Sequence, residues 1–250
     1  MKLENKVIFI TGGVRDIGRA VSKKLAAEGA KLGINYYGSE DQAKSLAEEF
    51  QRDGIDAVIL QGDMTKQADV DELVKQTTDK FGSDVHGLVN IAGGLVERKS
   101  VADMDEDFFD KVIKLNLNST FLTVKKVMPL MSKGGAIVNL ASQAGRDGGG
   151  PGAAAYATSK GAVMTFTRAL AKELGPQGIR ANSLCPGMIS TGFHDTFTKD
   201  EVRSNVANAT PLRREGTSEE VASAVSFLMT DESSFVTGTN IDINGGLLFS

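Results

Sequence analysis

Short apolar runs alternate with longer stretches of helical periodicity along nearly the whole chain. The runs are rich in Val and Ile and lack polar alternation, which is typical of parallel strands buried on both faces. The predicted strands are residues 7–10, 31–35, 57–61, 87–91, 136–141, 181–184 and 240–243. The predicted helices are residues 17–28, 41–53, 70–81, 105–131, 154–174 and 218–230. This alternation predicts an α/β fold: a doubly wound parallel sheet of about seven strands with helices on both faces.

Composition limits the classes of function. The 250 residues are 41% hydrophobic and 24% charged, so we expect one globular domain over residues 1–250. A net charge of −4 argues against nucleic acid or an anionic membrane as a partner. The single Cys185 excludes an internal disulfide. The only two histidines, His86 and His194, are far apart in the sequence, which argues against a histidine-based metal site. Every apolar run is too short to span a membrane and no signal peptide is recognisable, so a cytoplasmic location is expected.

A glycine-containing turn, TGGVRDIG over residues 11–18, follows the first predicted strand and leads directly into a helix. Such glycines let the backbone approach a pyrophosphate, and the helix N-terminus supplies free N–H groups. A tight turn with a packing glycine is the alternative. The predicted phosphate contacts are Gly12, Arg15, Asp16, Ile17 and Gly18. Asp16 stands where a third glycine is expected, and because a pyrophosphate would repel its carboxylate, we expect the side chain to turn away toward Arg15 or Arg19.

The end of the second predicted strand bears on the choice of cofactor. Residues 34–39 contain no acid, and the first is Glu40. An acid here would bind the ribose 2′-hydroxyl of NAD, whereas basic or neutral donors admit the 2′-phosphate of NADP. We therefore expect NADPH/NADP, with NADH as the less favoured cofactor. The side chains assigned to this end of the dinucleotide are Arg15, Asn35, Tyr36, Tyr37 and Ser39.

Tyr156 and Lys160 lie four residues apart near the start of a predicted helix, so their side chains share one face. A nearby ammonium favours the phenolate and lowers the tyrosine pKa, which suits a proton-transfer group. Taken alone, such a pair is more often an ordinary helix surface. Ser142, however, follows a predicted strand at the carboxyl edge of the sheet, where open α/β sheets bind ligands. The three residues together predict a site for proton transfer at a carbonyl or alcohol.

These motifs, in this order, resemble those of the short-chain dehydrogenase/reductase family over nearly the whole chain. The residues that carry the resemblance are Thr11, Gly12 and Gly18; Asp63; Asn90, Ile91, Ala92 and Gly93; Asn116; Ser142, Tyr156 and Lys160; Pro186, Gly187 and Thr191; and Asn244, Gly245 and Gly246. The resemblance implies a single-domain Rossmann fold, hydride transfer with a nicotinamide dinucleotide, and a homotetramer built on the two longest helices and the C-terminal strand region. The chain departs from the family at Asp16 and Ile91, and the loop between Ser142 and Tyr156 looks one residue longer.

The resemblance also implies individual roles. Tyr156 would be the general acid in reduction, Lys160 would hold the nicotinamide ribose and lower the tyrosine pKa, and Ser142 would stabilise the developing alkoxide. Asn116 would kink its helix and hold a water that links Lys160 to solvent. The other implied cofactor contacts are Asp63 at the adenine edge, Asn90 beside the adenosine, Met64, Ala92, Gly93, Pro186, Gly187, Ile189 and Thr191.

The substrate is the least determined property. Arg146 follows Ser142 by four residues in a glycine-rich loop, and an arginine there would bind a substrate carboxylate in a bidentate manner. A solvated arginine paired with Asp147 is the alternative. Together with Ser142, Tyr156 and Phe193, Arg146 forms the predicted substrate set. We therefore favour a small polar carbonyl, such as a sugar-derived keto acid or 4-deoxy-5-keto uronate.

Two other hypotheses stay open. General likeness to 3-oxoacyl-carrier-protein reductases favours a 3-oxoacyl thioester, although only Lys133, and not Gln177, is basic where an acidic carrier would bind. A non-catalytic dinucleotide-binding sensor or scaffold is the alternative from another class. In each case residues 192–217 are expected to form a mobile lid over the substrate.

Overall fold

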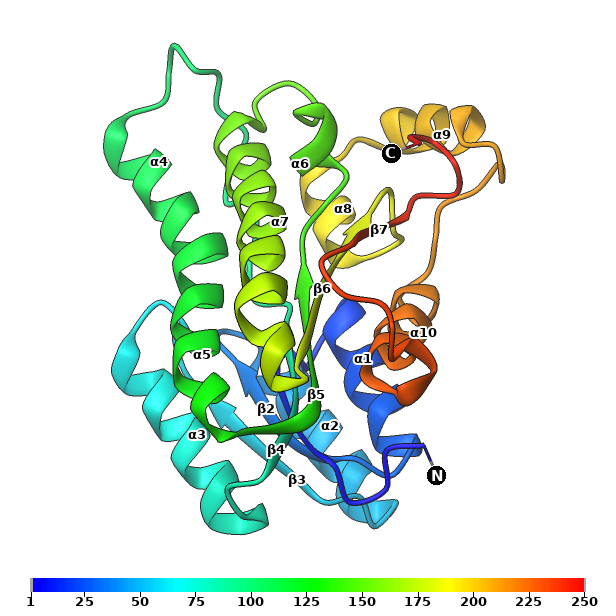
Figure 1. Cartoon of the computed structure of the whole chain (residues 1–250). Helices are drawn as coiled ribbons and strands as arrows, with labels where there is room; N and C mark the ends of the chain where they lie inside the picture. Colours follow the sequence, from blue (N-terminus) through cyan, green and yellow to red (C-terminus); the bar gives the residue numbers. More distant parts are fainter. Residues whose placement is uncertain (1, 250) are drawn as a thin grey trace.

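All seven predicted strands form one sheet, in which every neighbouring pair is parallel (Figure 1). The computed structural model describes residues 2–249. The strands are β1 (Val7–Thr11), β2 (Lys31–Tyr36), β3 (Ala57–Gln61), β4 (Val85–Asn90), β5 (Met131–Leu140), β6 (Arg180–Pro186) and β7 (Asn240–Ile243). Their order is β3-β2-β1-β4-β5-β6-β7. The prediction of a doubly wound α/β fold is confirmed.

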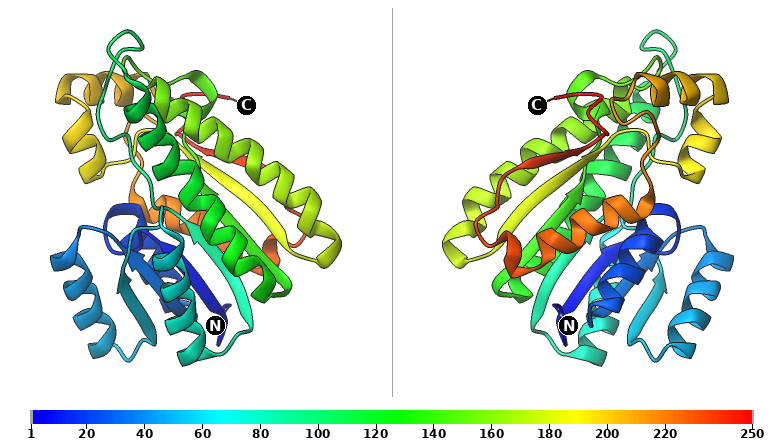
Figure 2. Two further views of the ribbon diagram at one scale, coloured as in Figure 1. Left: turned by 90° about the vertical axis from the view of Figure 1, so that its left-hand side faces the viewer. Right: turned by 90° about the vertical axis from the view of Figure 1, so that its right-hand side faces the viewer.

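Two helical layers cover the sheet (Figure 2). One layer consists of α1 (Asp16–Ala27), α2 (Glu40–Arg52) and α10 (Ser218–Met229), and the other of α3 (Gln67–Phe81), α5 (Ser119–Val127) and α7 (Ala154–Leu174). Leu25, Leu46 and Val225 belong to the core cluster of the first layer, whereas Leu73 and Leu170 belong to that of the second. Because both faces of the sheet are covered, its strands are continuously apolar.

The predicted helix 105–131 is not one continuous α-helix. It consists of α4 (Glu106–Ile113), a π-helical turn η1 (Lys114–Asn118), α5 and a 3₁₀ turn η2 (Met128–Leu130), after which β5 begins at Met131. Asn116 lies in the π-helical turn, where its side-chain amide donates to the Val112 carbonyl at 3.0 Å. A side chain inserted among the main-chain hydrogen bonds is a recognised cause of such irregularity. The implied kink at Asn116 is therefore present.

Short helices occupy segments that lack strong periodicity. They are α6 (Ala144–Asp147), α8 (Gly192–Phe197), α9 (Asp200–Ala209) and the 3₁₀ turns η3 (Gly175–Gln177) and η4 (Asp231–Ser233). The glycine-rich segment after β5 was expected to be only a loop, but α6 forms within it. The segment predicted to be a lid, residues 192–217, contains α8 and α9. Both helices lie beyond the carboxyl end of the sheet (Figure 1).

The topology places the candidate site. Strand order reverses between β1 and β4, and open parallel sheets bind ligands at such a switch point, outside the carboxyl ends of the strands. Thr11 ends β1 and pairs in register with Asn90 at the end of β4. Ser142 follows β5 at the same edge. The phosphate-type turn and the proposed proton-transfer residues are thereby brought together from distant parts of the chain.

Candidate active site

The turn between β1 and α1 is built around two glycines that admit no side chain. Gly12 has φ +68°, and a Cβ there would lie 3.0 Å from the Ala92 backbone nitrogen. A Cβ on Gly18 would lie 1.9 Å from the Gly12 carbonyl oxygen. Glycine at both positions lets the turn close tightly onto the first turn of α1. These are the features a backbone cradle for a pyrophosphate needs, so the turn fits the predicted dinucleotide.

The expectation that Asp16 turns away from a pyrophosphate stays a prediction, but the main partner of its carboxylate was not anticipated. Its Oδ1 accepts a hydrogen bond from the Gly192 backbone N–H at 3.1 Å, and its Oδ2 lies 3.8 Å from Arg15 Nη1. Arg19, the other proposed partner, pairs instead with Glu49 at 2.7 Å. Asp16 also adopts φ +48°, a left-handed conformation that Asp tolerates better than most residues. The aspartate therefore joins the cofactor turn to the lid.

The predicted 2′-phosphate pocket needs one correction. Asn35 is buried, and its side-chain amide donates to the carbonyls of Tyr36 and Gly62 at 3.0 and 2.8 Å. Because these donors are used inside the protein, the Asn35 side chain supports the turn and does not offer itself to a phosphate. Arg15 and Tyr37 are exposed and keep their assignment. Tyr36 and Ser39, both partly buried, also keep it.

The two residues expected to contact the adenosine, Asn90 and Asp63, also have hydrogen-bond partners within the protein. Asn90 is buried; its amide donates to Asn139 at 2.8 Å and its carbonyl oxygen accepts from Thr123 at 2.6 Å. Its side chain therefore ties β4 to β5 and α5 rather than lining the adenosine. Asp63 accepts from the Thr65 N–H and hydroxyl through Oδ1, and its Oδ2 lies 3.9 Å from Lys66 Nζ; the implied adenine contact of Asp63 stays a prediction.

Ser142, Tyr156 and Lys160 converge at the end of β5. Tyr156 and Lys160 lie on α7, and the Ser142 hydroxyl lies close enough to the Tyr156 phenol to affect its pKa. Lys160 is buried, and its Nζ donates to the Leu140 carbonyl at 2.6 Å. A Cβ on Gly93 would lie 2.5 Å from Asn116 Oδ1 and 3.3 Å from Lys160 Nζ, which accounts for the glycine after β4. The three sequence-predicted residues thus form one cluster.

The pKa of Tyr156 differs from the sequence-based expectation. Burial raises it above its ordinary value of 10.0, and the nearby Ser142 hydroxyl opposes the rise. Lys160 Nζ lies 5.8 Å from the centre of the Tyr156 ring. The expected lowering of the tyrosine pKa by Lys160 is therefore not seen, because burial is the larger effect here. Burial also lowers the pKa of Lys160 to about 8.

Asn116 supports the cluster from the π-helical turn. Its Oδ1 accepts from the Gly94 N–H at 3.0 Å, and its Nδ2 donates to the Gly94 carbonyl at 2.9 Å. The residue thereby fixes the segment after β4, next to Lys160. Its implied role in holding a water stays a prediction.

The segment after β6 uses its main chain to reach the same edge. The Gly187 N–H donates to the Ile243 carbonyl at 3.0 Å, and Ile189 is buried and forms a bridge with Gly216. Thr191 precedes α8, and its hydroxyl donates to the Ile189 carbonyl at 3.1 Å. Pro186 ends β6. The implied contacts of this segment with the carboxamide and pyrophosphate stay predictions.

Arg146 does not face a substrate. Its Nε donates to Asp242 Oδ1 at 2.6 Å, and its Nη2 donates to the Asn240 carbonyl. The side chains of Arg146 and Asp242 are each only 15% exposed. The neighbouring Asp147, which was the alternative partner, is bonded to Gln143. The prediction that Arg146 binds a substrate carboxylate is wrong, because its guanidinium is held by β7.

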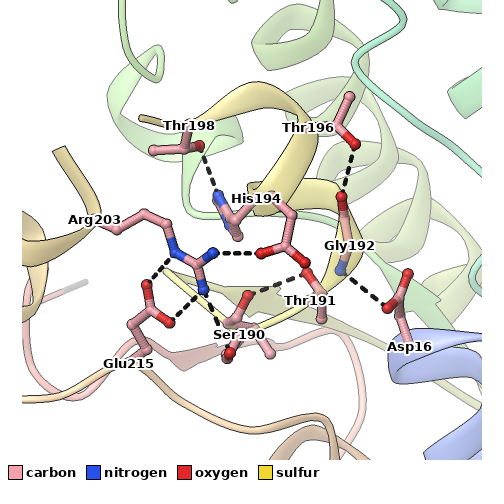
Figure 3. Close-up of polar contacts among 11 residues, drawn as sticks. Asp16, Ser190, Thr191, Gly192, His194, Thr196, Thr198, Arg203 and Glu215 are labelled. Atoms are coloured by element: carbon pink, nitrogen blue, oxygen red, sulfur yellow. Dashed lines mark hydrogen bonds and ion pairs between the residues drawn. The ribbon is translucent and has the colours of Figure 1, made fainter. Parts of the chain in front are cut away.

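Helix α8, in the segment predicted to be a lid, places aromatic side chains beside Tyr156. The ring centres of Phe193 and Tyr156 are 6.0 Å apart, and Phe197 follows at 5.1 Å from Phe193. Figure 3 shows Arg203 of α9 bonded to Glu215, in the segment before α10. Arg203 also bonds to Asp195 of α8. The bidentate Arg203–Glu215 contacts are both 2.7 Å. The predicted substrate role of Phe193 agrees with its place.

Acidification is expected to weaken the lid through His194. Burial, together with the charges of Arg203 and Arg98, lowers the pKa of His194 to about 4, while Glu215 and Asp195 oppose this shift. A histidine in the unfolded chain has a pKa near 6.5. The neutral, buried His194 therefore contributes fully to the free energy of unfolding above pH 6.5, and this contribution is lost as pH falls toward 4. It amounts to at most about 3 kcal/mol. Chemical denaturation between pH 7.5 and 4.5 should show a smaller loss in His194→Gln than in wild type. Equal losses would contradict the assignment.

Sequence reasoning missed three residues that shape the site. Arg98, Arg203 and Asp242 each bond across the mouth or wall of the site. None of the three belongs to a recognisable sequence motif. Their bonding partners are not neighbours on one turn of a helix or one strand, so residue spacing does not indicate them. Among residues 2–249, no group of three or more His, Cys, Asp or Glu side chains is arranged to hold a metal ion. Within that part of the chain, too, no helix combines the length and apolar character needed to cross a membrane.

Fold and site together define an α/β oxidoreductase with a Ser–Tyr–Lys centre. A family model described as Enoyl-(Acyl carrier protein) reductase matches residues 12–248. The 3-oxoacyl-(acyl-carrier-protein) reductase of Staphylococcus epidermidis is 36% identical over 245 residues, which cover 97% of this chain and 99% of that protein. The same-named reductase of Synechocystis is 36% identical over 98% of both chains. The chain belongs to the short-chain dehydrogenase/reductase family.

Solved structures agree with this assignment. A blue fluorescent protein from a metagenomic library, in complex with NADPH, matches with a TM-score of 0.93, 31% identity and 100% of both chains. A short-chain dehydrogenase from Burkholderia cenocepacia, in complex with NADP, matches with a TM-score of 0.91, 29% identity and 99% of both chains. The cofactors in these two relatives are of the kind predicted for this chain.

Proposed function

We propose that this protein reduces a 3-oxoacyl thioester to the 3-hydroxyacyl thioester with NADPH. The observation that carries the reaction is the cluster at the carboxyl edge: Ser142 follows β5 beside Tyr156, and Lys160 is buried on the same helix as Tyr156, 5.8 Å from the centre of its ring. Similarity to 3-oxoacyl-(acyl-carrier-protein) reductases supports the thioester. Pairing of Arg146 with Asp242 removes the main argument for a keto acid.

The residues of the chain suit the reductive direction. When bound, NADPH supplies the hydride. The Ser142 hydroxyl donates to the substrate carbonyl oxygen, and Tyr156 gives that oxygen a proton as charge develops on it. Because burial raises the pKa of Tyr156, the phenol stays protonated at neutral pH and is ready to act as an acid. Lys160, with its pKa lowered to about 8, is still mostly an ammonium at pH 7 and would hold the nicotinamide ribose through its N–H groups.

The preference for NADPH rests on the end of β2. Arg15, Tyr37 and Ser39 offer a cation and hydroxyls where the 2′-phosphate would lie, and Glu40 is bonded to Gln61 at 2.9 Å. Two structural relatives contain NADPH or NADP. These observations support a phosphate-accepting pocket that lacks a competing acid.

The assembly and the lid belong to the same proposal. Phe121 on α5 is 45% exposed and packs edge-on against Phe166 of α7, with ring centres 6.3 Å apart. An exposed aromatic side chain on α5, in contact with α7, suits the homotetramer proposed for this single-domain, cytoplasmic enzyme. Residues 192–217 would open and close as its lid.

Initial rates with a small substrate panel test the proposal. We expect NADPH oxidation with an acetoacetyl thioester, little with a sugar-derived keto uronate, and slower reaction with NADH. Activity with the keto uronate alone would contradict the thioester proposal and favour a small polar carbonyl as the substrate. Tight NADPH binding without turnover of any carbonyl would indicate a sensor or scaffold.

A further inference from the structure

The first helix of the lid, α8, is held at its first residue by the cofactor turn. The Gly192 N–H donates to Asp16 Oδ1 at 3.1 Å, as Figure 3 shows. Asp16 and Gly192 are 176 positions apart in the sequence. Asp16 reaches this partner from a backbone with φ +48°, which Gly and Asn also adopt readily. The aspartate in place of the usual glycine therefore adds a contact that glycine lacks.

The same helix is held at its last residue by Arg98, in the segment after β4. Arg98 Nε donates to the Phe197 carbonyl at 3.0 Å, and its Nη1 donates to the Pro151 carbonyl at 2.9 Å. Pro151 lies in the loop that leads into α7, the helix that carries Tyr156. A Cβ on Gly152 would lie 2.9 Å from Arg98 Cβ, so this loop packs closely against the arginine. One guanidinium thus joins the lid to the loop before the catalytic helix.

Between these two contacts, α8 carries the aromatic wall of the site. Phe193 lies next to Tyr156, and Phe197 lies next to Phe193. Because α8 has only six residues, its place depends on contacts at its ends more than on its own hydrogen bonds. Loss of either end contact would let the wall move relative to the tyrosine.

We propose that Asp16 and Arg98 are positioning residues that hold α8 over Tyr156 and thereby set the substrate wall formed by Phe193. Neither residue is assigned a part in proton or hydride transfer. Asp16 acts through the Gly192 N–H, and Arg98 acts through two backbone carbonyls. The kinetic part of the test rests on the proposed reductase function, whereas the exchange measurement below does not.

Hydrogen–deuterium exchange of the intact protein tests the anchors without substrate. Arg98→Met keeps the aliphatic part of the side chain and removes both hydrogen bonds of the guanidinium. We therefore expect the amide exchange rate in residues 192–197 to rise about tenfold, which corresponds to about 1.4 kcal/mol for the loss of two exposed hydrogen bonds. Asp16→Gly should raise it as well. Asp16→Asn retains an acceptor on a backbone that suits it, so its rise should be clearly smaller. The control is Lys199→Gln, an exposed charge on the same lid, with no expected rise.

Kinetics test whether the anchors position the substrate wall. Arg98→Met should raise the KM for the carbonyl substrate about tenfold, because the bound substrate would lose contact with the wall formed by Phe193. The KM for NADPH should change much less. Lys199→Gln should change neither KM. Unchanged exchange in Arg98→Met, equal exchange in the two Asp16 variants, or equal KM effects in Arg98→Met and Lys199→Gln would each overturn the proposal. Altered exchange in an enzyme that reduces no carbonyl would support the anchors and refute only the proposed function.

Discussion

Replacing Tyr156 by Phe is expected to reduce the turnover of carbonyl reduction by about 10²- to 10⁴-fold, the range typical for loss of a positioned proton donor. The change removes one oxygen atom and keeps the ring beside Phe193, 6.0 Å away between ring centres. The helix and the lid therefore stay in place. The measurement is single-turnover reduction at saturating NADPH, so that binding and chemistry are separated.

The proton-transfer assignment has its own controls. The Tyr156→Phe protein should still bind NADPH, as measured by cofactor fluorescence, and should unfold with a midpoint close to that of wild type. Ser142→Ala should also slow turnover, because it removes the hydroxyl beside Tyr156 that would donate to the substrate. Turnover near the wild-type rate in Tyr156→Phe would show that another group supplies the proton.

Replacing Arg146 by Met is expected to destabilise the protein by roughly 3 kcal/mol, because Asp242 would be left as a nearly buried, unpaired carboxylate. The pair is short, at 2.6 Å, and both side chains are 15% exposed. The replacement also removes the hydrogen bond that Arg146 donates to the Asn240 carbonyl. Urea denaturation at pH 7 measures the free energy of unfolding, and the slope with urea should stay unchanged.

A double variant separates pairing from substrate binding. Arg146→Met combined with Asp242→Leu removes both charges and should recover most of the lost stability, since an apolar replacement of a buried pair is often close to neutral. The KM for a carboxylate-bearing carbonyl should be the same in wild type and in the double variant. A large rise in that KM, confined to acidic substrates, would restore Arg146 as a substrate contact.

The parts of the fold that were predictable depend on short-range order. Apolar runs and helical periodicity gave the strands and most helices, because burial on a sheet or helix face repeats every few residues. The prediction failed at residues 105–131, where the Asn116 side chain interrupts one helix with a π-helical turn. Periodicity does not reveal which side chain will bond to a main-chain carbonyl.

The candidate site divides in the same way. Tyr156 and Lys160 were found from a four-residue spacing, and Ser142 from its place after a strand, because the carboxyl ends of parallel strands share one edge. The partner of Arg146 was not found, since Asp242 lies 96 positions away. Burial of Tyr156, which raises its pKa, was likewise not visible in the sequence. Both depend on which surfaces the folded chain covers.

The sequence by itself determined the class of this protein: a doubly wound α/β fold, a glycine turn suited to a dinucleotide, and a Ser–Tyr–Lys centre at one edge of the sheet. Only the tertiary structure decided how side chains are used within that frame. It committed Arg146 and Asn90 to internal partners, and it turned Asp16 toward the lid. The physical reason is that local pattern fixes the elements and their order, whereas hydrogen bonding and burial depend on atoms brought together across the whole chain.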